Sequence, residues 1–139
     1  MTTPTTVEVT EVGPRDGLQA EPEFVATGQK IRLINNLIDA GVPRIEFSSF
    51  VSPRAVPQLT DVVEVFEGIN RSSSTVLAAL VPNAKGAVRA AETGIDEIIV
   101  FLSASESHNL KNVNRTVDES LVGFEEVARI AAKANIPVQ

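Results

Sequence analysis

One pattern repeats four times along the chain: a short run of β-branched and apolar residues, then a polar loop, then a segment whose apolar residues have helical spacing. Strands and helices that alternate in this way form a parallel sheet with right-handed crossovers. Two architectures have this order of elements, the doubly wound open sheet and the eightfold (β/α)8 barrel. The repeat therefore restricts the chain to the α/β class before any single residue is considered.

The repeat predicts where each element lies. We expect strands over residues 7–12, 44–50, 75–81 and 97–102. We expect a first helix between an N-cap at Thr27 and a terminating glycine at Gly41. Further helices are expected over residues 61–70, 84–93 and 118–134, the last after a capping box of Thr116 and Glu119. The long segment 103–115 is expected to be a polar loop.

The number of residues alone favours an open sheet of four or five strands, since the chain has 139 residues. However, residues 136–139 have the composition of a fifth strand that has only begun. A complete barrel needs about 250 residues. We therefore expect a (β/α)8 TIM-barrel fold in which residues 1–139 form four βα units, the N-terminal part of a single domain that stops at the start of strand 5.

Composition excludes several kinds of function. The net charge of −6 disfavours nucleic acid as a partner. The chain has no cysteine, which excludes thiolate catalysis and cysteine-bound metals, and its single histidine, His108, excludes a two-histidine metal site within the chain. The apolar runs are far shorter than a membrane span, and the N-terminus resembles no targeting signal. We expect a soluble, cytoplasmic protein with no membrane partner.

In both candidate architectures, ligands bind beyond the carboxyl ends of the strands. The loop after the first strand, Gly13–Gln19, places Arg15 beside Asp16 between two glycines that permit tight turns. Arg15 is suited to bind a carboxylate or a developing oxyanion, and Asp16 to bind a hard divalent cation or to accept a proton. The alternative is a turn whose charged side chains are only solvated.

Glu46 lies within an otherwise apolar or small-residue strand. If Ile45 and Phe47 face the helices, alternation directs Glu46 toward the barrel interior. A carboxylate there needs a partner, and Arg15 at the end of the neighbouring strand is the natural one. The pair is either purely structural or orients Arg15 for function, and the two interpretations are compatible.

The two later loops are weaker candidates. Residues 82–86 place Asn83 and Lys85 either at a ligand or in an ordinary strand-to-helix turn. Segment 103–115 holds several amides together with His108, which is more typical of a surface residue than of a ligand. The chain has no dinucleotide fingerprint, no phosphate-binding Walker loop and no Ser-His-Asp set. These patterns disfavour dehydrogenases, nucleotide hydrolases and serine esterases.

Several segments together resemble the 3-hydroxy-3-methylglutaryl-CoA lyases, a branch of the metallolyase barrel superfamily that also contains isopropylmalate and homocitrate synthases. The likeness extends from about Val7 to the last residue. The segments that carry it are residues 9–19, 45–53, 56–58, 82–86, 104–106 and 111–114. The block 45–53 resembles the lyase branch in particular.

The resemblance implies retro-Claisen cleavage of 3-hydroxy-3-methylglutaryl-CoA to acetyl-CoA and acetoacetate, as in leucine degradation and ketone-body metabolism. It implies that Arg15 stabilises the enolate-like oxygen of the thioester and that Asp16 is a ligand of Mg²⁺ or Mn²⁺. It also implies that Glu46 orients Arg15 or joins the polar network around it. Three further residues are implied to contact the acyl-CoA substrate: Gln19, Ser49 and Asn112.

The resemblance also implies that two metal-binding histidines, an asparagine ligand and a mobile cysteine loop come from the second half of the barrel. Because Asp16 alone cannot hold Mg²⁺ in a defined geometry, we expect residues 1–139 to be inactive by themselves. Two alternatives stay open. One is a condensing synthase acting on a 2-oxo acid. The other is a non-catalytic half-barrel that self-associates, for example as a homodimer.

Overall fold

The structure is a computed structural model, and it describes residues 4–139. Its one sheet has four parallel strands in the order β1-β2-β3-β4. The strands are β1 (Thr10–Glu11), β2 (Arg44–Ser49), β3 (Val76–Leu80) and β4 (Glu97–Ile99). The helices are α1 (Thr27–Asp39), α2 (Val62–Gly68), α3 (Ala84–Thr93), α4 (Glu106–Val113) and α5 (Val117–Lys133). A short helical turn, η1 (Gly13–Gly17), follows β1, and a second, η2 (Pro57–Leu59), precedes α2.

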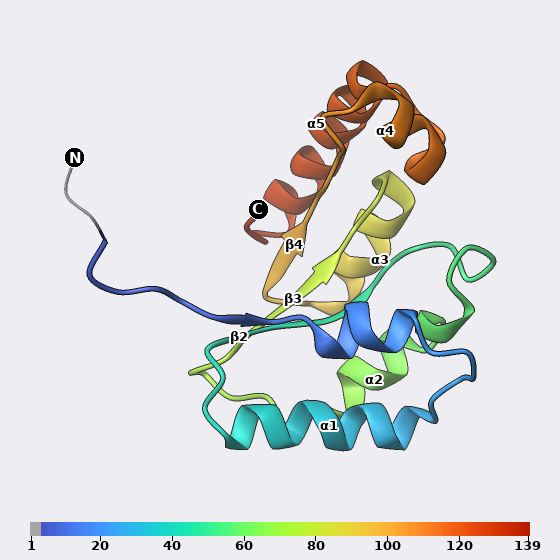
Figure 1. The fold of residues 1–139 in the computed structure, drawn as a ribbon. Helices are drawn as coiled ribbons and strands as arrows, with labels where there is room; N and C mark the ends of the chain where they lie inside the picture. The colour runs from blue at the N-terminus through green and yellow to red at the C-terminus, as the bar shows by residue number, and fades with distance from the viewer. Residues whose placement is uncertain (1–3) are drawn as a thin grey trace.

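The strand order distinguishes the two candidate architectures. Each strand lies next to its neighbour in the sequence, and the order does not reverse as it does in a doubly wound sheet. One continuous core joins α1, α2, α3 and α5 to the same face of the sheet, whereas a doubly wound sheet carries helices on both faces (Figure 1). The fold is therefore that of a (β/α)8 barrel, and the described residues form four of its βα units.

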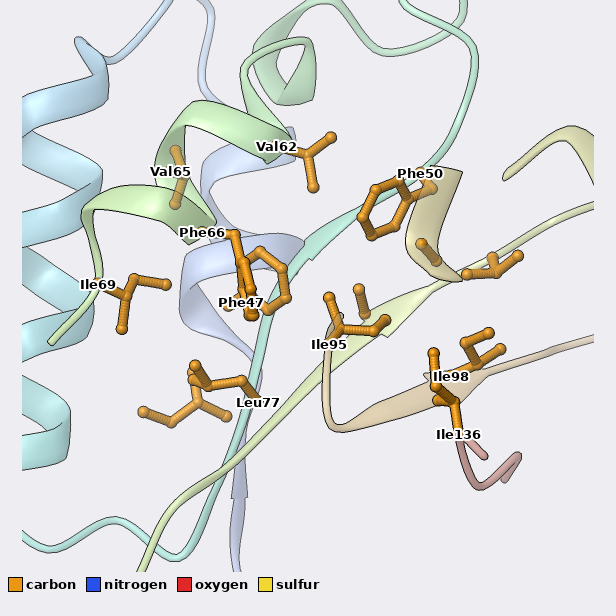
Figure 2. Packing of buried hydrophobic residues seen from close by; sticks show 14 of the residues in the cluster. Phe47, Phe50, Val62, Val65, Phe66, Ile69, Leu77, Ile95, Ile98 and Ile136 are labelled. Carbon is orange, nitrogen blue, oxygen red and sulfur yellow. The ribbon is translucent and has the colours of Figure 1, made fainter. Parts of the chain in front are cut away.

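The core lies between the strands and the helices, and Figure 2 shows its centre. The strands contribute alternate residues to it, as the period of two requires. The buried strand residues of this face are Ile45, Phe47, Leu77, Ala79 and Ile98. The aromatic ring of Phe47 lies 5.4 Å from that of Phe66 on α2, which fixes the helix-facing side of β2 (Figure 2).

Local sequence signals set most helix ends. Gly41, which was predicted to end the first helix, has a φ angle of 78° after α1. Gly94 ends α3 in the same way, with a φ angle of 76°. The predicted capping box of Thr116 and Glu119 is present at the start of α5. The prediction that Thr27 is an N-cap was wrong. Helix α1 begins at Thr27 itself, and the hydroxyl of Thr27 donates to the carboxylate of Asp61, the N-cap residue of α2, instead of capping α1.

Two strands are shorter than predicted, because a strand ends where its partner ends. Thr10 pairs with Arg44, the first residue of β2, so residues 7–9 have no opposite residues in that strand. β4 pairs with β3 only over residues 97–99. Residues 136–139, predicted to begin a fifth strand, form an isolated parallel bridge to β4 between Val138 and Ile98. Val100 extends this pairing by donating its N–H to the carbonyl oxygen of Gln139 at 2.9 Å.

The segment after β4 is not the plain loop that was predicted, because it contains α4. Ser105 caps α4 through its side chain, and Asn114 ends the helix in the left-handed conformation. The apolar periodicity that reveals other helices is weak here, since α4 buries an asparagine, Asn109. No helix in the described part of the chain combines the length and hydrophobicity that a membrane crossing requires.

Candidate active site

The candidate site lies where β1 ends, beside the middle of β2. After Val12 the chain forms η1, one π-helical turn, rather than an open glycine-rich loop. The N–H groups of Arg15 and Asp16 both donate to the carbonyl oxygen of Val12, at 3.0 and 2.7 Å. Gly13 and Gly17 do not have positive φ angles, so neither is required for a left-handed backbone conformation. The N–H of Gly13 donates to a carboxylate oxygen of Glu11 at 2.6 Å.

Three charged side chains form a continuous chain of hydrogen bonds at this point. Arg15 Nε donates to Oε1 of Glu46, and Arg15 Nη1 donates to Oδ1 of Asp16 at 2.6 Å. The side chains of Arg15 and Glu46 are 17% and 7% exposed, and that of Asp16 is 66% exposed. The predicted ion pair between Arg15 and Glu46 is therefore present, and Asp16 extends it toward solvent.

The fold explains why Glu46 is buried. Phe47 packs on α2, so alternation places Glu46 on the face of β2 that points away from the helices. The register between β2 and β3 shifts between Glu46 and Ser48, which marks a local irregularity next to the site. A buried carboxylate without a partner is costly, and Arg15 supplies the required charge and donor.

The arrangement leaves specific groups available for a ligand. Arg15 uses Nε and Nη1 for the two carboxylates, and Nη2 has no hydrogen-bond partner within residues 4–139. A guanidinium held on two sides is a pre-organised donor for an anionic oxygen. Oδ2 of the exposed Asp16 is likewise unpaired among the described residues, so it is suited to bind a cation.

The other three predicted site residues lie apart from this chain of hydrogen bonds. Gln19 is exposed on the segment after η1. Ser49 is buried, and its hydroxyl donates to the carbonyl oxygen of Leu80 at 3.2 Å, so it links β2 to β3. Asn112 is exposed near the end of α4 and lines a separate cavity. The structure therefore brings Arg15, Asp16 and Glu46 together but not Gln19, Ser49 or Asn112.

The cavity beside Asn112 has a volume of about 310 Å³ and lies beyond the ends of β2, β3 and β4. Its wall combines apolar side chains with amides and one arginine. Phe101 and Phe124 contribute aromatic surface, and Asn83, Asn112 and Arg115 contribute polar groups. Asn83 also caps α3 by accepting the N–H of Gly86 at 3.0 Å, so segment 82–86 is a strand-to-helix turn that also faces the cavity.

Sequence reasoning counted Asn109 among the amides of a polar loop and missed its structural role, which is to hold the wall of this cavity. Its side chain is fully buried, and its Nδ2 donates to the carbonyl oxygens of Arg115 and Thr116 and to the hydroxyl of Ser120. Its Oδ1 accepts the N–H of Ser103 at 3.0 Å. The helix signals around it, Ser105 and Asn114, were the clue that this segment is ordered. The neighbouring His108 is exposed, in line with a surface residue.

The described residues fit a divalent cation only in part. Asp16 offers an exposed carboxylate oxygen, which is a suitable ligand for Mg²⁺ or Mn²⁺. Within residues 4–139, however, no three side chains of His, Cys, Asp or Glu come together as a metal-binding group. A complete coordination shell therefore requires ligands beyond these residues, and no chemical step is assigned to the metal within this chain alone.

Comparison with known proteins agrees with this geometry. The HMGL-like family profile matches residues 6–139. The hydroxymethylglutaryl-CoA lyase of Bacillus subtilis is 49% identical over 133 residues, which cover 96% of this chain and 44% of that protein. The mitochondrial hydroxymethylglutaryl-CoA lyase of Gallus gallus is 48% identical over 136 residues, which cover 98% of this chain and 46% of that protein.

Solved structures give the same result. The crystal structure of the B. subtilis HMG-CoA lyase superposes with a TM-score of 0.94 at 48% identity, covering 99% of this chain and 46% of the other. An HMG-CoA lyase from Acinetobacter baumannii, in complex with coenzyme A and 3-methylmalate, superposes with a TM-score of 0.91 at 45% identity, covering 99% and 45%. The chain thus spans less than half the length of the relatives it matches. With its barrel winding and its matched sequence, the chain belongs to the HMGL-like family.

Proposed function

We propose that this chain supplies the Arg15, Asp16 and Glu46 part of the active site of a divalent-metal-dependent lyase that cleaves 3-hydroxy-3-methylglutaryl-CoA. The observation that carries the proposal is the chain of hydrogen bonds from Glu46 through Arg15 to Asp16 at the carboxyl end of β1, beside β2. Its position agrees with the rule that barrel enzymes place their chemistry at this end of the strands.

The proposed reaction is a retro-Claisen cleavage. The C3 hydroxyl loses its proton as its oxygen becomes the ketone of acetoacetate. The C2–C3 bond breaks, and its electron pair passes to the thioester as an enolate, which gains a proton to give acetyl-CoA. In this step Nη2 of Arg15 donates to the thioester oxygen as negative charge develops there. Glu46 is a positioning residue, because it contacts Arg15 rather than the reacting atoms.

Asp16 is proposed to be one ligand of a Mg²⁺ or Mn²⁺ ion. Such an ion polarises and orients the hydroxyl and carboxylate oxygens of the substrate when it is bound. The exposed carboxylate of Asp16, fixed through one oxygen by Arg15, supports this assignment. The remaining ligands are proposed to come from outside residues 1–139.

Part of the thioester is proposed to occupy the cavity lined by Asn112. The amide and aromatic side chains that line the cavity suit the part of the acyl-CoA that is a chain with amide groups. Gln19 is exposed after η1 and is kept as a proposed substrate contact. Ser49 is proposed to support the substrate pocket rather than to contact the substrate, because its hydroxyl already donates to the carbonyl oxygen of Leu80.

The test uses a chimera in which residues 6–139 of this chain replace the matching part of the B. subtilis lyase. The 48% identity and TM-score of 0.94 favour correct folding of the chimera. We expect the chimera to release acetoacetate from 3-hydroxy-3-methylglutaryl-CoA, to lose this activity on chelation and to regain it with Mn²⁺. We also expect Asp16→Asn to require more Mn²⁺ for the same rate.

The same chimera separates the alternatives. Condensation of acetyl-CoA with a 2-oxo acid, without thioester cleavage, would replace the proposal with a synthase function. A folded chimera that does neither would contradict the proposed site.

Two further expectations stay proposals. The chain is proposed to self-associate, because Val7 and Val9 beside β1 are 88% and 65% exposed and β1 pairs with a single strand within the described residues. A cytoplasmic location is also proposed, and relatives with both mitochondrial and cytoplasmic names are known.

A further inference from the structure

A second buried ion pair lies apart from Arg15 and joins α1 to the start of α2. Lys30 is 3% exposed, and its Nζ donates to Oδ1 of Asp61 at 2.7 Å. The other carboxylate oxygen of Asp61 accepts the hydroxyl of Thr27 at 2.8 Å. Both carboxylate oxygens of Asp61 thus accept hydrogen bonds from side chains of α1. Side chains that are this buried and this fully bonded fix the relative position of the elements that carry them.

Asp61 gives up a local role to make these contacts. It occupies the N-cap position of α2, where an aspartate normally accepts an N–H of its own helix. Here it makes no such bond, because its oxygens bind Lys30 and Thr27. The pair therefore serves the connection between two segments rather than the helix that contains Asp61.

The same contacts continue into the two loops of the site. Nζ of Lys30 also donates to the carbonyl oxygen of Gln58, and the side chain of Gln58 donates to the carbonyl oxygen of Glu21 at 2.8 Å. The ring of Phe24 covers the ammonium group, with its centroid 4.1 Å from Nζ. The segment after η1 is thereby fastened to the segment after β2.

The first of these segments follows η1, which carries Arg15, and the second follows β2, which carries Glu46. Arg15 is held to β2 by Glu46 on one side of the loop, and Lys30 and Asp61 hold the other side of the same loop. We propose that Lys30 and Asp61 are positioning residues that fasten the β1–α1 loop to the β2–α2 loop and so fix Arg15 and Asp16 for the proposed reaction. This inference rests on the proposed function for its consequence, but not for the contact itself.

The test is amide hydrogen exchange on the 139-residue chain. The N–H groups of Asp16, Ala20 and Glu21 are hydrogen-bonded within the loop, so their exchange is measurable. We expect Lys30→Met to speed their exchange roughly tenfold or more, while amides of β3 and α5 change little. Thr27→Val is a milder variant that keeps the ion pair, and we expect a smaller change in the same amides. Thr27→Ser should restore the original rates.

Lys133→Met, on an exposed lysine at the end of α5, is the control and should leave the loop unchanged. Equal acceleration in β3, α5 and the loop with both Lys30→Met and Thr27→Val would overturn the proposal, since it would mark the pair as only structural. Unchanged loop exchange would overturn it as well. Neither outcome depends on lyase activity, so failure of the proposed function would be recognised separately in the chimera. In the active chimera, Thr27→Val should lower kcat more than it changes KM.

Discussion

At the scale of single residues, the site depends on the guanidinium group of Arg15, which is held between two carboxylates. Arg15 has little freedom left, because Glu46 and Asp16 occupy two of its nitrogens. A side chain that is already fixed loses little entropy when a ligand binds to its third nitrogen. Glu46 therefore contributes to the site by removing alternative positions of Arg15.

Replacing Glu46 should lower stability measurably. Glu46→Ala leaves the largely buried Arg15 without its inner partner, and we expect the free energy of unfolding to fall by about 2–3 kcal/mol. Glu126→Ala is the control, because Glu126 forms an exposed pair with Arg129, and its effect should stay within about 0.5 kcal/mol. Urea unfolding followed by circular dichroism suits a chain without Trp or Tyr. Equal effects of the two variants would show that the Glu46 pair does not stabilise the fold.

The two buried ion pairs differ in how far sequence predicts them. The Arg15–Glu46 pair followed from strand alternation, because a lone carboxylate in an apolar strand demands a partner. The Lys30–Asp61 pair carried no such signal. Lys30 lies in an amphipathic helix and Asp61 at a helix start, where charged residues are usually exposed. Only the packing of α1 against α2 reveals that both are buried.

At the scale of elements, helix ends were predicted better than strand lengths. The ends of α1 and α3 depend on Gly41 and Gly94, whose conformation is a local property. The lengths of β1 and β4 depend on how far the neighbouring strand extends, which no local pattern encodes. Helix α4 was missed for a related reason: the residue it buries is Asn109, which no search for apolar periodicity finds.

Close packing of α3 against β2 gives a prediction for one glycine. An added Cβ at Gly86 would lie 2.8 Å from the backbone oxygen of Phe50, which cannot move freely. We expect Gly86→Ala to lower the free energy of unfolding by about 1–2 kcal/mol despite its better helix propensity. Gly28→Ala, in the first turn of α1 with open space around it, should raise stability by about 0.5–1 kcal/mol. Stabilisation by both substitutions would contradict the packing.

At the scale of the whole molecule, the parallel order of strands and the single helical layer determine what the sheet exposes. Exposed valines precede β1, which forms an edge of the described sheet, and an unpaired edge of this kind pairs readily with another strand. We expect sedimentation velocity of the 139-residue chain to show association that increases with concentration. Val9→Lys, which adds a charge to the edge, should shift the chain toward monomer. A monomer at all concentrations would contradict the proposed self-association.

Arg15 is proposed to donate a hydrogen bond to the developing oxyanion of the thioester. The most direct test of this role is the rate at which the Arg15→Gln chimera releases acetoacetate. Loss of one donor to a developing oxyanion typically lowers kcat by about 10²–10³-fold, and we expect a loss of this size with the fold retained. Arg32→Gln, on an exposed arginine of α1, should leave the rate unchanged. A folded Arg15→Gln chimera that cleaves the thioester as fast as the Arg32→Gln control would contradict the proposed role of Arg15.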